Sequence, residues 1–333
     1  MNRRDFVRTA SLGGTAALLG IRPDPVAAEG PLETTRIRIV QIPGICLAPQ
    51  YVAEALLQAE GFTEVRYVKR AEGTDAIYKD LATGEADISM AFVAPFIVQV
   101  DAGLPIVLLS GVHVGCFELW GNGQVRAVRD LKGKTVSIAG FGTAHHVFLA
   151  SIAAHVGLDP GRDINFVTHP SAEGMRLFAE GKIDAYMGFP PDPQELRAKK
   201  VGHVIVNSAM DRPWSQYFCC VATGNREFVR KHPVATKRAL RAILKAANIC
   251  ATEPARAAQV LVDRGFTRRY DWALQTMKDL PYDKWRVYDA QDTVRYYALR
   301  LRESGMIKAT PQKILADGAD WRFLDELKKE LKG

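Results

Sequence analysis

The sequence predicts an α/β protein of two similar lobes joined by two strands, followed by a helical C-terminal region. The main observation is a segment that occurs twice, at residues 81–95 and 178–190. One constant offset matches Gly84, Asp87, Met90 and Phe92 to Gly181, Asp184, Met187 and Phe189. Each copy indicates the end of a helix, a glycine in the left-handed cap position and a short apolar strand. Each strand stops at a proline, which cannot continue the ladder of a sheet.

The same order of parts also precedes each copy. An apolar strand at 37–40 leads through a Gly/Pro turn to a helix that ends at 60. Another strand at 135–139 leads through a glycine turn to a helix at 146–155. Two α/β units of the same construction are therefore expected. Ligands of open α/β sheets bind beyond the carboxyl ends of the strands, so we expect the site in a cleft where the two units face each other.

The composition indicates a soluble globular protein with two domains. The chain has 333 residues, of which 47% are hydrophobic and 24% are charged, and both values are ordinary for this class. The net charge is +7, and much of the basic excess lies at helical spacing in the last third. Such spacing is typical of the solvated face of a helix, so nucleic acid is not an expected partner.

The five cysteines, Cys46, Cys116, Cys219, Cys220 and Cys250, follow no CxxC or Cys/His spacing. We therefore expect no metal site and no cofactor. Cys219 and Cys220 lie in an apolar run and are interpreted as small buried hydrophobic residues. An odd number of cysteines leaves at least one thiol unpaired. The sequence leaves open whether Cys219 and Cys220 are oxidised.

The N-terminal residues have the order of an export signal. A twin-arginine pair, Arg3 and Arg4, precedes an apolar segment of small residues at 10–21, and small residues follow up to Ala28. This order predicts a twin-arginine signal peptide at 1–28, cleaved near Ala28 to release a soluble periplasmic protein. The apolar run is too short to span a membrane. Because this route exports folded protein, a cofactor acquired before export is permitted but not required.

The remaining elements follow in order along the chain. We expect a first lobe at 37–128 plus 213–333 and a second lobe at 129–212. Strands are predicted at 37–40, 65–68, 87–91, 106–110, 135–139, 166–167, 184–188 and 204–207, and 213–222 is expected to return to the first lobe as a strand. Crossings near 124–134 and 208–216 are the predicted hinges. The 3.6-residue periodicity predicts C-terminal helices at 233–252, 254–264, 270–280, 289–304 and 320–331.

Several of these segments carry a family resemblance. They are residues 49–53, 81–87, 130–134, 157–160 and 178–185. On these motifs the chain resembles the substrate-binding proteins of ABC importers in the nitrate/sulfonate/taurine group, which is related to the proteins that bind pyrimidine precursors of thiamine. The resemblance covers roughly residues 37–250. It implies the type II periplasmic-binding-protein fold, closure of two lobes on a small-molecule solute, and an inner-membrane ABC permease as partner. We expect a monomer.

The loops after the strands are the expected ligand-binding positions. The candidates are Gly44, Cys46, Met90, Ala91, Phe92, His113, Gly142, Thr143, His145, Phe189, Pro190 and Trp214. Gly142 and Thr143 open a helix, whose first N–H groups favour an anionic group. The hydroxyl of Thr143 can serve a ligand or simply cap the helix. His145 and His146 are adjacent, so at most one of them faces the cleft.

Aromatic residues near these loops point to an organic solute. Phe92, Phe189, Trp120 and Trp214 can stack on a planar ligand, although each can equally belong to a core. The loops carry few Arg or Lys residues, which argues against a small, strongly hydrated anion such as nitrate. We expect a small organic solute, aromatic or anionic, with one polar end. Glu118 can accept a hydrogen bond from an amine.

An enzyme on the same fold is the alternative. The resemblance extends to a desulfinase with a cysteine in the loop after its first strand, and Cys46 occupies that loop here, with His113 as a possible partner. A cysteine nucleophile requires a lowered pKa and a base, which a sequence cannot show. Otherwise Cys46 is a small apolar residue, and we expect no catalytic residue. A periplasmic sensor partner without transport is a third possibility.

Overall fold

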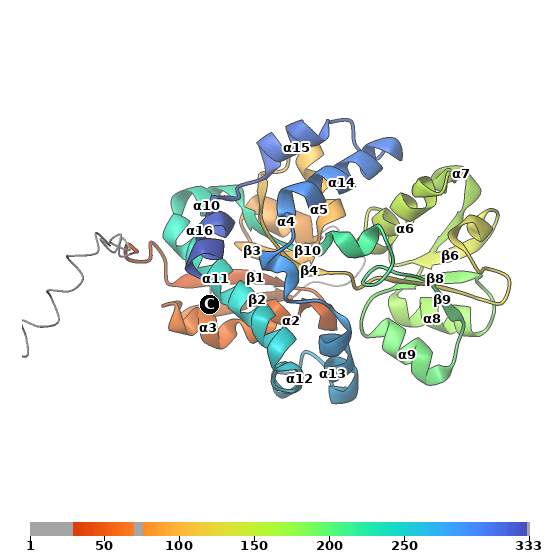
Figure 1. Cartoon of the computed structure of the whole chain (residues 1–333), viewed down its shortest axis with the longest axis horizontal. Coiled ribbons are helices and arrows are strands. Elements are labelled where there is room, and N and C mark those ends of the chain that lie inside the picture. Colours follow the sequence, from red (N-terminus) through yellow and green to blue (C-terminus); the bar gives the residue numbers. More distant parts are fainter. Residues whose placement is uncertain (1–28, 70–75, 332–333) are drawn as a thin grey trace, which may run out of the picture. The chain divides into compact units, whose positions relative to one another are not determined.

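The computed structural model describes residues 29–69 and 76–331, and the chain divides into two compact units, Met1–Pro31 and Leu32–Gly333. The fold described below belongs to the second unit (Figure 1). The predicted signal peptide and its cleavage position lie outside the described residues. Within the described ranges, no helix combines the length and the apolar character needed to cross a membrane.

Two five-stranded mixed sheets form the centres of two lobes. The first contains β1 (Arg36–Gln41), β2 (Glu64–Lys69), β3 (Ile88–Phe92), β4 (Ile106–Val114) and β10 (Phe218–Asn225), in the order β2-β1-β3-β10-β4. The second contains β5 (Glu118–Gly121), β6 (Thr135–Ile138), β7 (Asn165–Thr168), β8 (Ala185–Gly188) and β9 (His203–Asn207), in the order β7-β6-β8-β5-β9. In each sheet three parallel strands are followed by one antiparallel strand, β10 or β5. The predicted two-lobed α/β fold is confirmed.

The repeated segment has the same structural role in both lobes. Gly84 and Gly181 adopt left-handed backbone conformations, with φ of 76° and 69°. Asp87 accepts a hydrogen bond from the backbone N–H of Arg38 at 2.7 Å, and Asp184 accepts one from that of Thr135 at 2.9 Å. Each aspartate therefore ties the strand of its copy, β3 or β8, to the neighbouring parallel strand, β1 or β6, which explains why the sequence repeats these residues.

Two short crossings connect the lobes. The chain passes from β4 to β5 through Gly115, Cys116 and Phe117, and it returns from β9 to β10 through residues 208–217. The second crossing lies where the sequence predicted it, but the first prediction, at 124–134, is wrong. Because β5 pairs with β8 and β9, the chain enters the second sheet at Glu118, within the range assigned to the first lobe. A strand of four residues fits either sheet, and only its pairing decides to which sheet it belongs.

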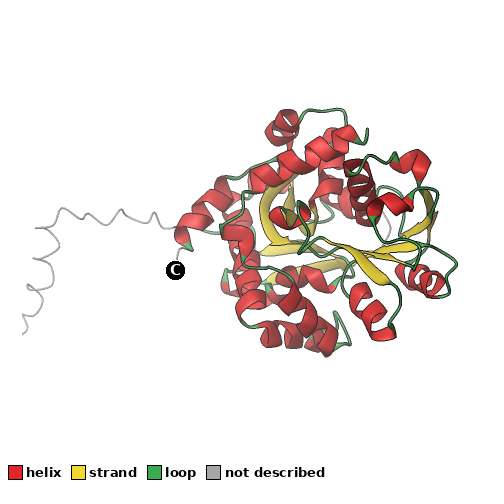
Figure 2. Ribbon diagram, turned by 45° about the vertical axis from the view of Figure 1, so that its right-hand side comes forward, coloured by secondary structure: helices red, strands yellow, loops and turns green. Residues whose placement is uncertain are grey.

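Helices cover both faces of the strands (Figure 2). Those up to residue 216 are η1 (Ile45–Leu47), α2 (Ala48–Val52), α3 (Glu54–Ala59), α4 (Ala76–Thr83), α5 (Val93–Asp101), η2 (Val128–Leu131), α6 (Ala144–His155), α7 (Pro160–Asp163), α8 (Ser171–Ala179), α9 (Asp192–Lys199) and η3 (Trp214–Gln216). The C-terminal set is α10 (Arg226–Lys231), α11 (Pro233–Thr252), α12 (Pro254–Asp263), α13 (Tyr270–Asp279), η4 (Lys284–Arg286), α14 (Ala290–Glu303), α15 (Pro311–Gly318) and α16 (Arg322–Glu330). The sequence predicted α11 with these bounds and missed α9 and α15.

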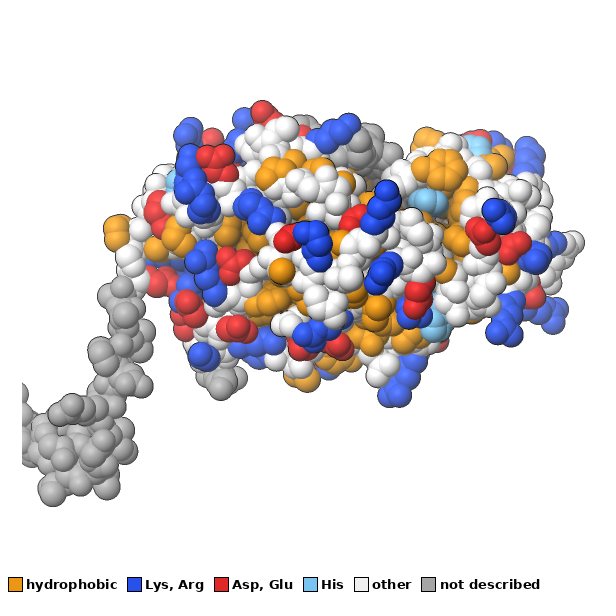
Figure 3. Space-filling view, turned by 90° about the horizontal axis from the view of Figure 1, so that it is seen from above, with side chains coloured by type: hydrophobic (Ala, Val, Ile, Leu, Met, Phe, Trp, Pro, Cys, Tyr) orange, Lys and Arg blue, Asp and Glu red, His pale blue; other side chains and the backbone are white. Residues whose placement is uncertain are grey.

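The basic face of α11 packs against acidic neighbours rather than facing solvent alone. Arg241 contacts Glu60 at 2.7 Å and Glu330 at 3.0 Å, and Lys237 contacts Glu326 at 2.7 Å. These pairs join α11 to α16 and to Glu60 at the end of α3. On the face shown in Figure 3, acidic and basic side chains are likewise interspersed.

The second lobe has its own small core. Trp120, Phe178, Tyr186 and Leu196 are buried together with Met175 and Ile183. Trp120, which the sequence offered as a stacking residue, is 3% exposed and belongs to this core. A much larger buried cluster surrounds β3, β4 and β10 and continues into the second lobe, where Val136, Phe148 and Met187 belong to it.

Candidate functional site

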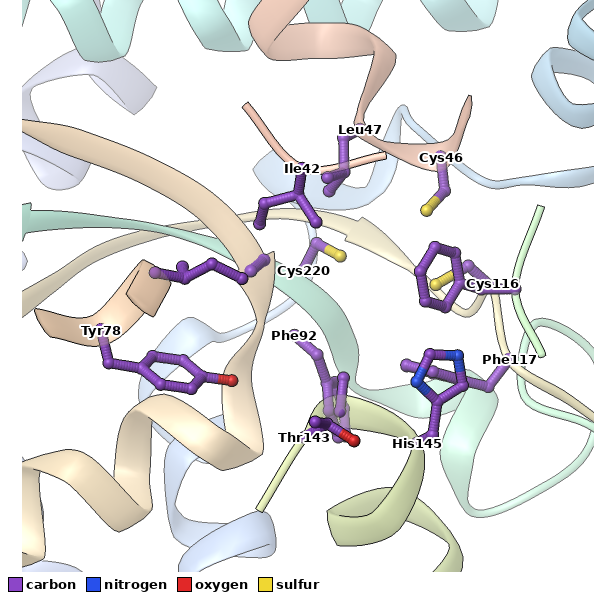
Figure 4. Close-up of a pocket in the computed structure, with 14 residues that line it drawn as sticks. Ile42, Cys46, Leu47, Tyr78, Phe92, Cys116, Phe117, Thr143, His145 and Cys220 are labelled. Carbon is purple, nitrogen blue, oxygen red and sulfur yellow. The ribbon is translucent and has the colours of Figure 1, made fainter. Parts of the chain in front are cut away.

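An apolar cavity lies between the two lobes and the crossings (Figure 4). The first lobe contributes residues after β1, in η1, on α4 and at the end of β3. The second lobe contributes the N-terminal end of α6 and Phe189 after β8. The lining residues are Ile42, Cys46, Leu47, Ile77, Tyr78, Ala91, Phe92, Cys116, Phe117, Thr143, Ala144, His145, Phe189 and Cys220. The cavity thus occupies the carboxyl ends of the strands, where ligands of α/β sheets bind.

Six of the twelve predicted site residues line this cavity. They are Cys46, Ala91, Phe92, Thr143, His145 and Phe189. The other six, Gly44, Met90, His113, Gly142, Pro190 and Trp214, are not among its lining residues. The structure therefore brings together the residues at the ends of β1, β3 and β8 and at the start of α6.

Met90, His113 and Trp214 are placed elsewhere by packing. Met90 is fully buried in the core of the first lobe, and its backbone N–H donates to Gln50 Oε1 at 3.2 Å. His113 is also fully buried, with its ring 5.1 Å from that of Tyr282. Trp214 packs edge-on against Phe148 at 5.3 Å. Successive side chains of a strand point to opposite faces, and the sequence did not show which face turns inward.

Gly44, Gly142 and Pro190 act through their backbones. A Cβ on Gly44 would lie 3.0 Å from the ring of Phe189, so the glycine allows the second lobe to approach. The carbonyl of Pro190 accepts a hydrogen bond from the N–H of Ile45 at 3.0 Å, which joins the two lobes directly. Gly142 has a φ of 75°, and its N–H donates to His146 Nδ1 at 3.1 Å.

Aromatic rings from both lobes meet at the cavity. Phe117 contacts Phe92 at 5.1 Å and Phe189 at 5.7 Å, both near edge-to-face. The imidazole of His145 stacks on Phe189 with centroids 4.9 Å apart and 28° between planes. Offset stacks and edge-to-face pairs are the favoured arrangements of such rings. They provide a flat surface against which a planar solute can lie.

The electrostatics of the cavity are nearly neutral. Its described lining residues include no Lys, Arg, Asp or Glu. Burial lowers the pKa of His145 to about 4, so its imidazole is uncharged at neutral pH. The polar feature is the start of α6, where the first N–H groups of a helix lack intrahelical acceptors. Thr143 is the N-cap residue of α6, but its hydroxyl donates to the carbonyl of Gly140 at 2.6 Å and makes no capping hydrogen bond to the helix.

Cys46 does not have the surroundings of an activated nucleophile. A hydrogen bond with Cys116 lowers the pKa of its thiol, but burial and the nearby Cys220 outweigh this, and the pKa is raised. The suggested partner, His113, lies opposite Cys220 in the pairing of β4 with β10. Burial lowers the pKa of His113, but Cys220 and the backbone of Val114 and Gly115 together raise it by more. The imidazole is thus associated with Cys220.

Eight lining residues were not among the sequence candidates. They are Ile42, Leu47, Ile77, Tyr78, Cys116, Phe117, Ala144 and Cys220. Cys116 and Phe117 were missed because the first crossing was expected after residue 124. Cys220 was interpreted as a small buried residue, and it is buried, but it also lines the cavity. No local sequence signal distinguishes Tyr78 from any other apolar residue of an amphipathic helix.

Glu118 lies in β5 of the second lobe and is not among the residues that line the cavity. Its Oε1 accepts from Arg197 at 2.5 Å and from Asn207 at 3.2 Å. Burial raises the pKa of Glu118, and the contact with Arg197 partly offsets that effect. The carboxylate thus has a structural partner on α9, an element that the sequence did not predict.

A family model described as the NMT1-like family matches residues 30–262, which is most of the chain. The chain belongs to the NMT1-like family. Among solved structures, the periplasmic nitrate-binding protein NrtA from Synechocystis PCC 6803 is similar, with a TM-score of 0.75 and 14% identity over 91% of this chain and 90% of that one. This likeness concerns the fold.

Two curated relatives differ in their described roles. The bicarbonate-binding protein CmpA of Synechococcus sp. is 30% identical over 113 residues, which span 33% of this chain but only 24% of CmpA. The 4-amino-5-hydroxymethyl-2-methylpyrimidine phosphate synthase THI12 of Saccharomyces cerevisiae is 25% identical over 234 residues, 65% of this chain and 67% of that protein. The relatives therefore include both a binding protein and a synthase.

Proposed function

We propose that the protein is the periplasmic solute-binding component of an ABC importer and captures a small organic solute between its lobes. The observation that carries this proposal is the aromatic-lined cavity, to which both lobes and the first crossing contribute. The similarity to NrtA and CmpA, which are named as binding proteins, supports it. The predicted export signal agrees with a periplasmic location, and the partner is an inner-membrane permease on which the monomer docks.

The lining favours a planar, largely apolar solute with one polar or anionic end. The ring packs against Phe117 and Phe189, and the polar end lies at the N-terminal end of α6. A small hydrated anion such as nitrate finds no charged side chain among the described lining residues. Removal of its hydration shell would therefore be poorly compensated.

Capture proceeds by closure of the lobes about the two crossings. In this structure the lobes already touch through Ile45 N–H and Pro190 O at 3.0 Å, and through Gln194 Nε2 and Thr276 Oγ1 at 3.1 Å. A solute that contacts both lobes shifts the population toward such a form. A micromolar dissociation constant corresponds to about −8 kcal/mol, part of which offsets the cost of closure.

The site gives less support to an enzyme that uses Cys46. Its thiol is buried and its pKa is raised, so it is protonated at neutral pH. A cysteine nucleophile needs the opposite shift and an adjacent base. We expect Cys46 to react slowly with iodoacetamide at pH 7. Fast and selective alkylation of this residue would favour the enzyme over the binding protein.

A thermal-shift screen of the mature protein tests the proposed function. The panel contains aromatic acids, heterocycles including pyrimidines, sulfonates, carboxylates, nitrate and bicarbonate. A solute at ~1,000 times its dissociation constant stabilises the folded protein by about 4 kcal/mol, which raises the midpoint by several degrees. We expect a hit among the planar organic compounds and none with nitrate. Absence of any hit, together with native mass spectrometry that finds no retained small molecule, would contradict the proposal.

A further inference from the structure

Four of the five cysteines converge on the junction between the lobes. Cys46 comes from η1, Cys116 from the first crossing, and Cys219 and Cys220 from the start of β10. The sulfur of Cys116 lies 3.2 Å from that of Cys219, which lies 3.9 Å from that of Cys220. All of these thiols are buried and reduced in the structure. Residues so distant in sequence meet here only because both crossings pass through the same point.

Cys116 and Cys219 lie where the two crossings touch. Ser208 of the second crossing accepts from the N–H groups of Cys116 at 3.1 Å and Phe117 at 2.9 Å. A Cβ on Gly115 would lie 2.3 Å from the Cα of Ala209, so these backbones are in direct contact. The thiol pair is therefore held inside the part of the molecule about which the lobes would rotate.

We propose that Cys116 and Cys219 are a disulfide-forming pair, and that their oxidation restrains the hinge of the binding protein. The disulfide fixes Cys116 to β10 in the sheet of the first lobe. Phe117 then remains as the one residue between this anchor and β5. This inference rests on the proposed function for its effect on closure, but the formation of the bond itself does not depend on any solute.

The oxidant is a disulfide of the surrounding compartment, either a small disulfide or that of a thiol oxidase. Cys116 lines the cavity, as do Cys46 and Cys220, whereas Cys219 does not, so Cys116 is the member of the proposed pair that the oxidant reaches. Burial raises the pKa of both thiols, so each gives up its proton as it reacts. The Cys116 sulfur attacks one sulfur of the oxidant and releases the other as a thiol, which leaves a mixed disulfide. The Cys219 sulfur then attacks the Cys116 sulfur and releases the second thiol. Two protons and two electrons pass from the cysteines to the oxidant.

A bound metal ion is the other chemistry that three neighbouring thiols suggest. The sulfurs of Cys116, Cys219 and Cys220 lie within 4.8 Å of one another. Two sulfurs on one tetrahedral zinc, with bonds of ~2.3 Å, are separated by ~3.8 Å. The separation of 3.2 Å between Cys116 and Cys219 is shorter, and the cluster identified among the described residues supplies three donors where a structural zinc site has four. The geometry therefore favours a sulfur–sulfur bond.

Counting thiols in the unfolded protein after oxidation tests the bond. The folded mature protein is incubated with oxidised glutathione, then unfolded and alkylated. We expect five alkylated cysteines before oxidation and three afterwards. Trypsin separates Cys116, in peptide 80–126, from Cys219 and Cys220, in peptide 201–226, so mass spectrometry should find these two peptides joined.

Four variants identify the partners. C116S and C219S should each retain all four remaining thiols after oxidation, whereas C220S should still join the two peptides. C250S removes a buried thiol of α11 outside the cluster and is the matched control, because its count should fall from four to two. Five alkylated thiols in the oxidised wild type would overturn the inference. Joined peptides in C219S, or a metal ion retained in native mass spectra, would overturn it as well.

The effect on the hinge needs a second measurement. With a solute from the thermal-shift screen, X-ray scattering should show compaction of the reduced protein and at least a twofold smaller change after oxidation. C116S should compact equally under both conditions. Equal compaction of the oxidised and reduced wild type would overturn the hinge role. If no solute in the screen binds, the proposed function is refuted, whereas the count of alkylated thiols still tests the disulfide independently.

Discussion

The repeated aspartates make a quantitative prediction, because their surroundings differ in one respect. Asp87 is 3% exposed and accepts from the Arg38 backbone at 2.7 Å, and it also holds the Arg38 guanidinium at 2.6 and 3.2 Å. Asp184 accepts from the Thr135 backbone at 2.9 Å and from the Asn122 amide at 3.2 Å, and no described residue forms an ion pair with it. We therefore expect D87A to destabilise the protein more than D184A.

The magnitudes follow from these contacts. A hydrogen bond to a charged group contributes about 1.5–3 kcal/mol. The ion pair with Arg38, whose side chain is 40% exposed, adds no more than about 1 kcal/mol. D87A should therefore lower the free energy of unfolding by about 3 kcal/mol and D184A by about 2 kcal/mol. D87N keeps an acceptor for the Arg38 N–H but loses the charge, so we expect about half the loss of D87A.

Urea unfolding at pH 7, followed by far-UV circular dichroism, measures these differences. The midpoint should fall in the order wild type, D87N and D87A, with an unchanged dependence on urea. A loss below about 1 kcal/mol for D87A would refute the assigned role of the repeat, since a buried N–H left unpaired costs at least that much. A larger loss for D184A than for D87A would refute the argument from the charged partner.

Three further predictions concern the cavity and the hinge. F189A removes the ring against which His145 stacks and should weaken binding of the screened solute about tenfold or more, whereas W214F, outside the cavity, should leave affinity unchanged in calorimetry. The pKa of His145 is lowered from 6.5 to about 4. Because the imidazole is neutral in the folded protein, its full contribution to the free energy of unfolding is present above pH 6.5. About 3 kcal/mol of that free energy is lost as the pH falls toward 4. H145Q should lose less stability than the wild type over that range in urea titrations, and an identical pH profile would contradict the assignment. G115A should destabilise by at least 2 kcal/mol more than G103A, because both have positive φ but only Gly115 meets another backbone; equal thermal midpoints would show that the contact is unimportant.

The features predicted from the sequence are those with local chemical causes. The glycine caps and strand-start aspartates of the repeat act within their own segments, so the two lobes could be inferred from them. Helix α11 was predicted at its observed bounds, because Pro233 suits the first helical position and the apolar face is long and periodic. The 3.6-residue pattern also located α12, α13 and α14 to within one residue at each end.

The missed elements depend on packing between distant segments. Strand β5 has only four residues, and its membership of the second sheet follows only from pairing with β8 and β9. Helix α9 begins directly after Pro191 and contains Pro193 in its first turn, a pattern that also indicates a loop. A proline in the first turn costs no intrahelical hydrogen bond, so tertiary packing decided in favour of the helix.

In the candidate site, too, the residues with a local sequence signal were predicted and those placed by packing were missed. Positions directly after strands or at a helix start, such as Phe92, Phe189 and Thr143, were predicted and line the cavity. Tyr78 comes from the side of a helix and Phe117 from a misplaced crossing, so neither had a local signal. His113 lies within β4, opposite Cys220 of β10, but is not among the residues that line the cavity. Which face of a strand points inward is set by the fold as a whole.

Small-angle X-ray scattering of the mature protein, with and without a saturating solute, tests the central claim most directly. If the solute is captured between the lobes, the reduced protein should become more compact, and F189A should require a higher solute concentration for the same change. An unchanged radius of gyration at full saturation, in a protein whose thermal midpoint the same solute raises, would show that binding does not close the lobes and would contradict the account.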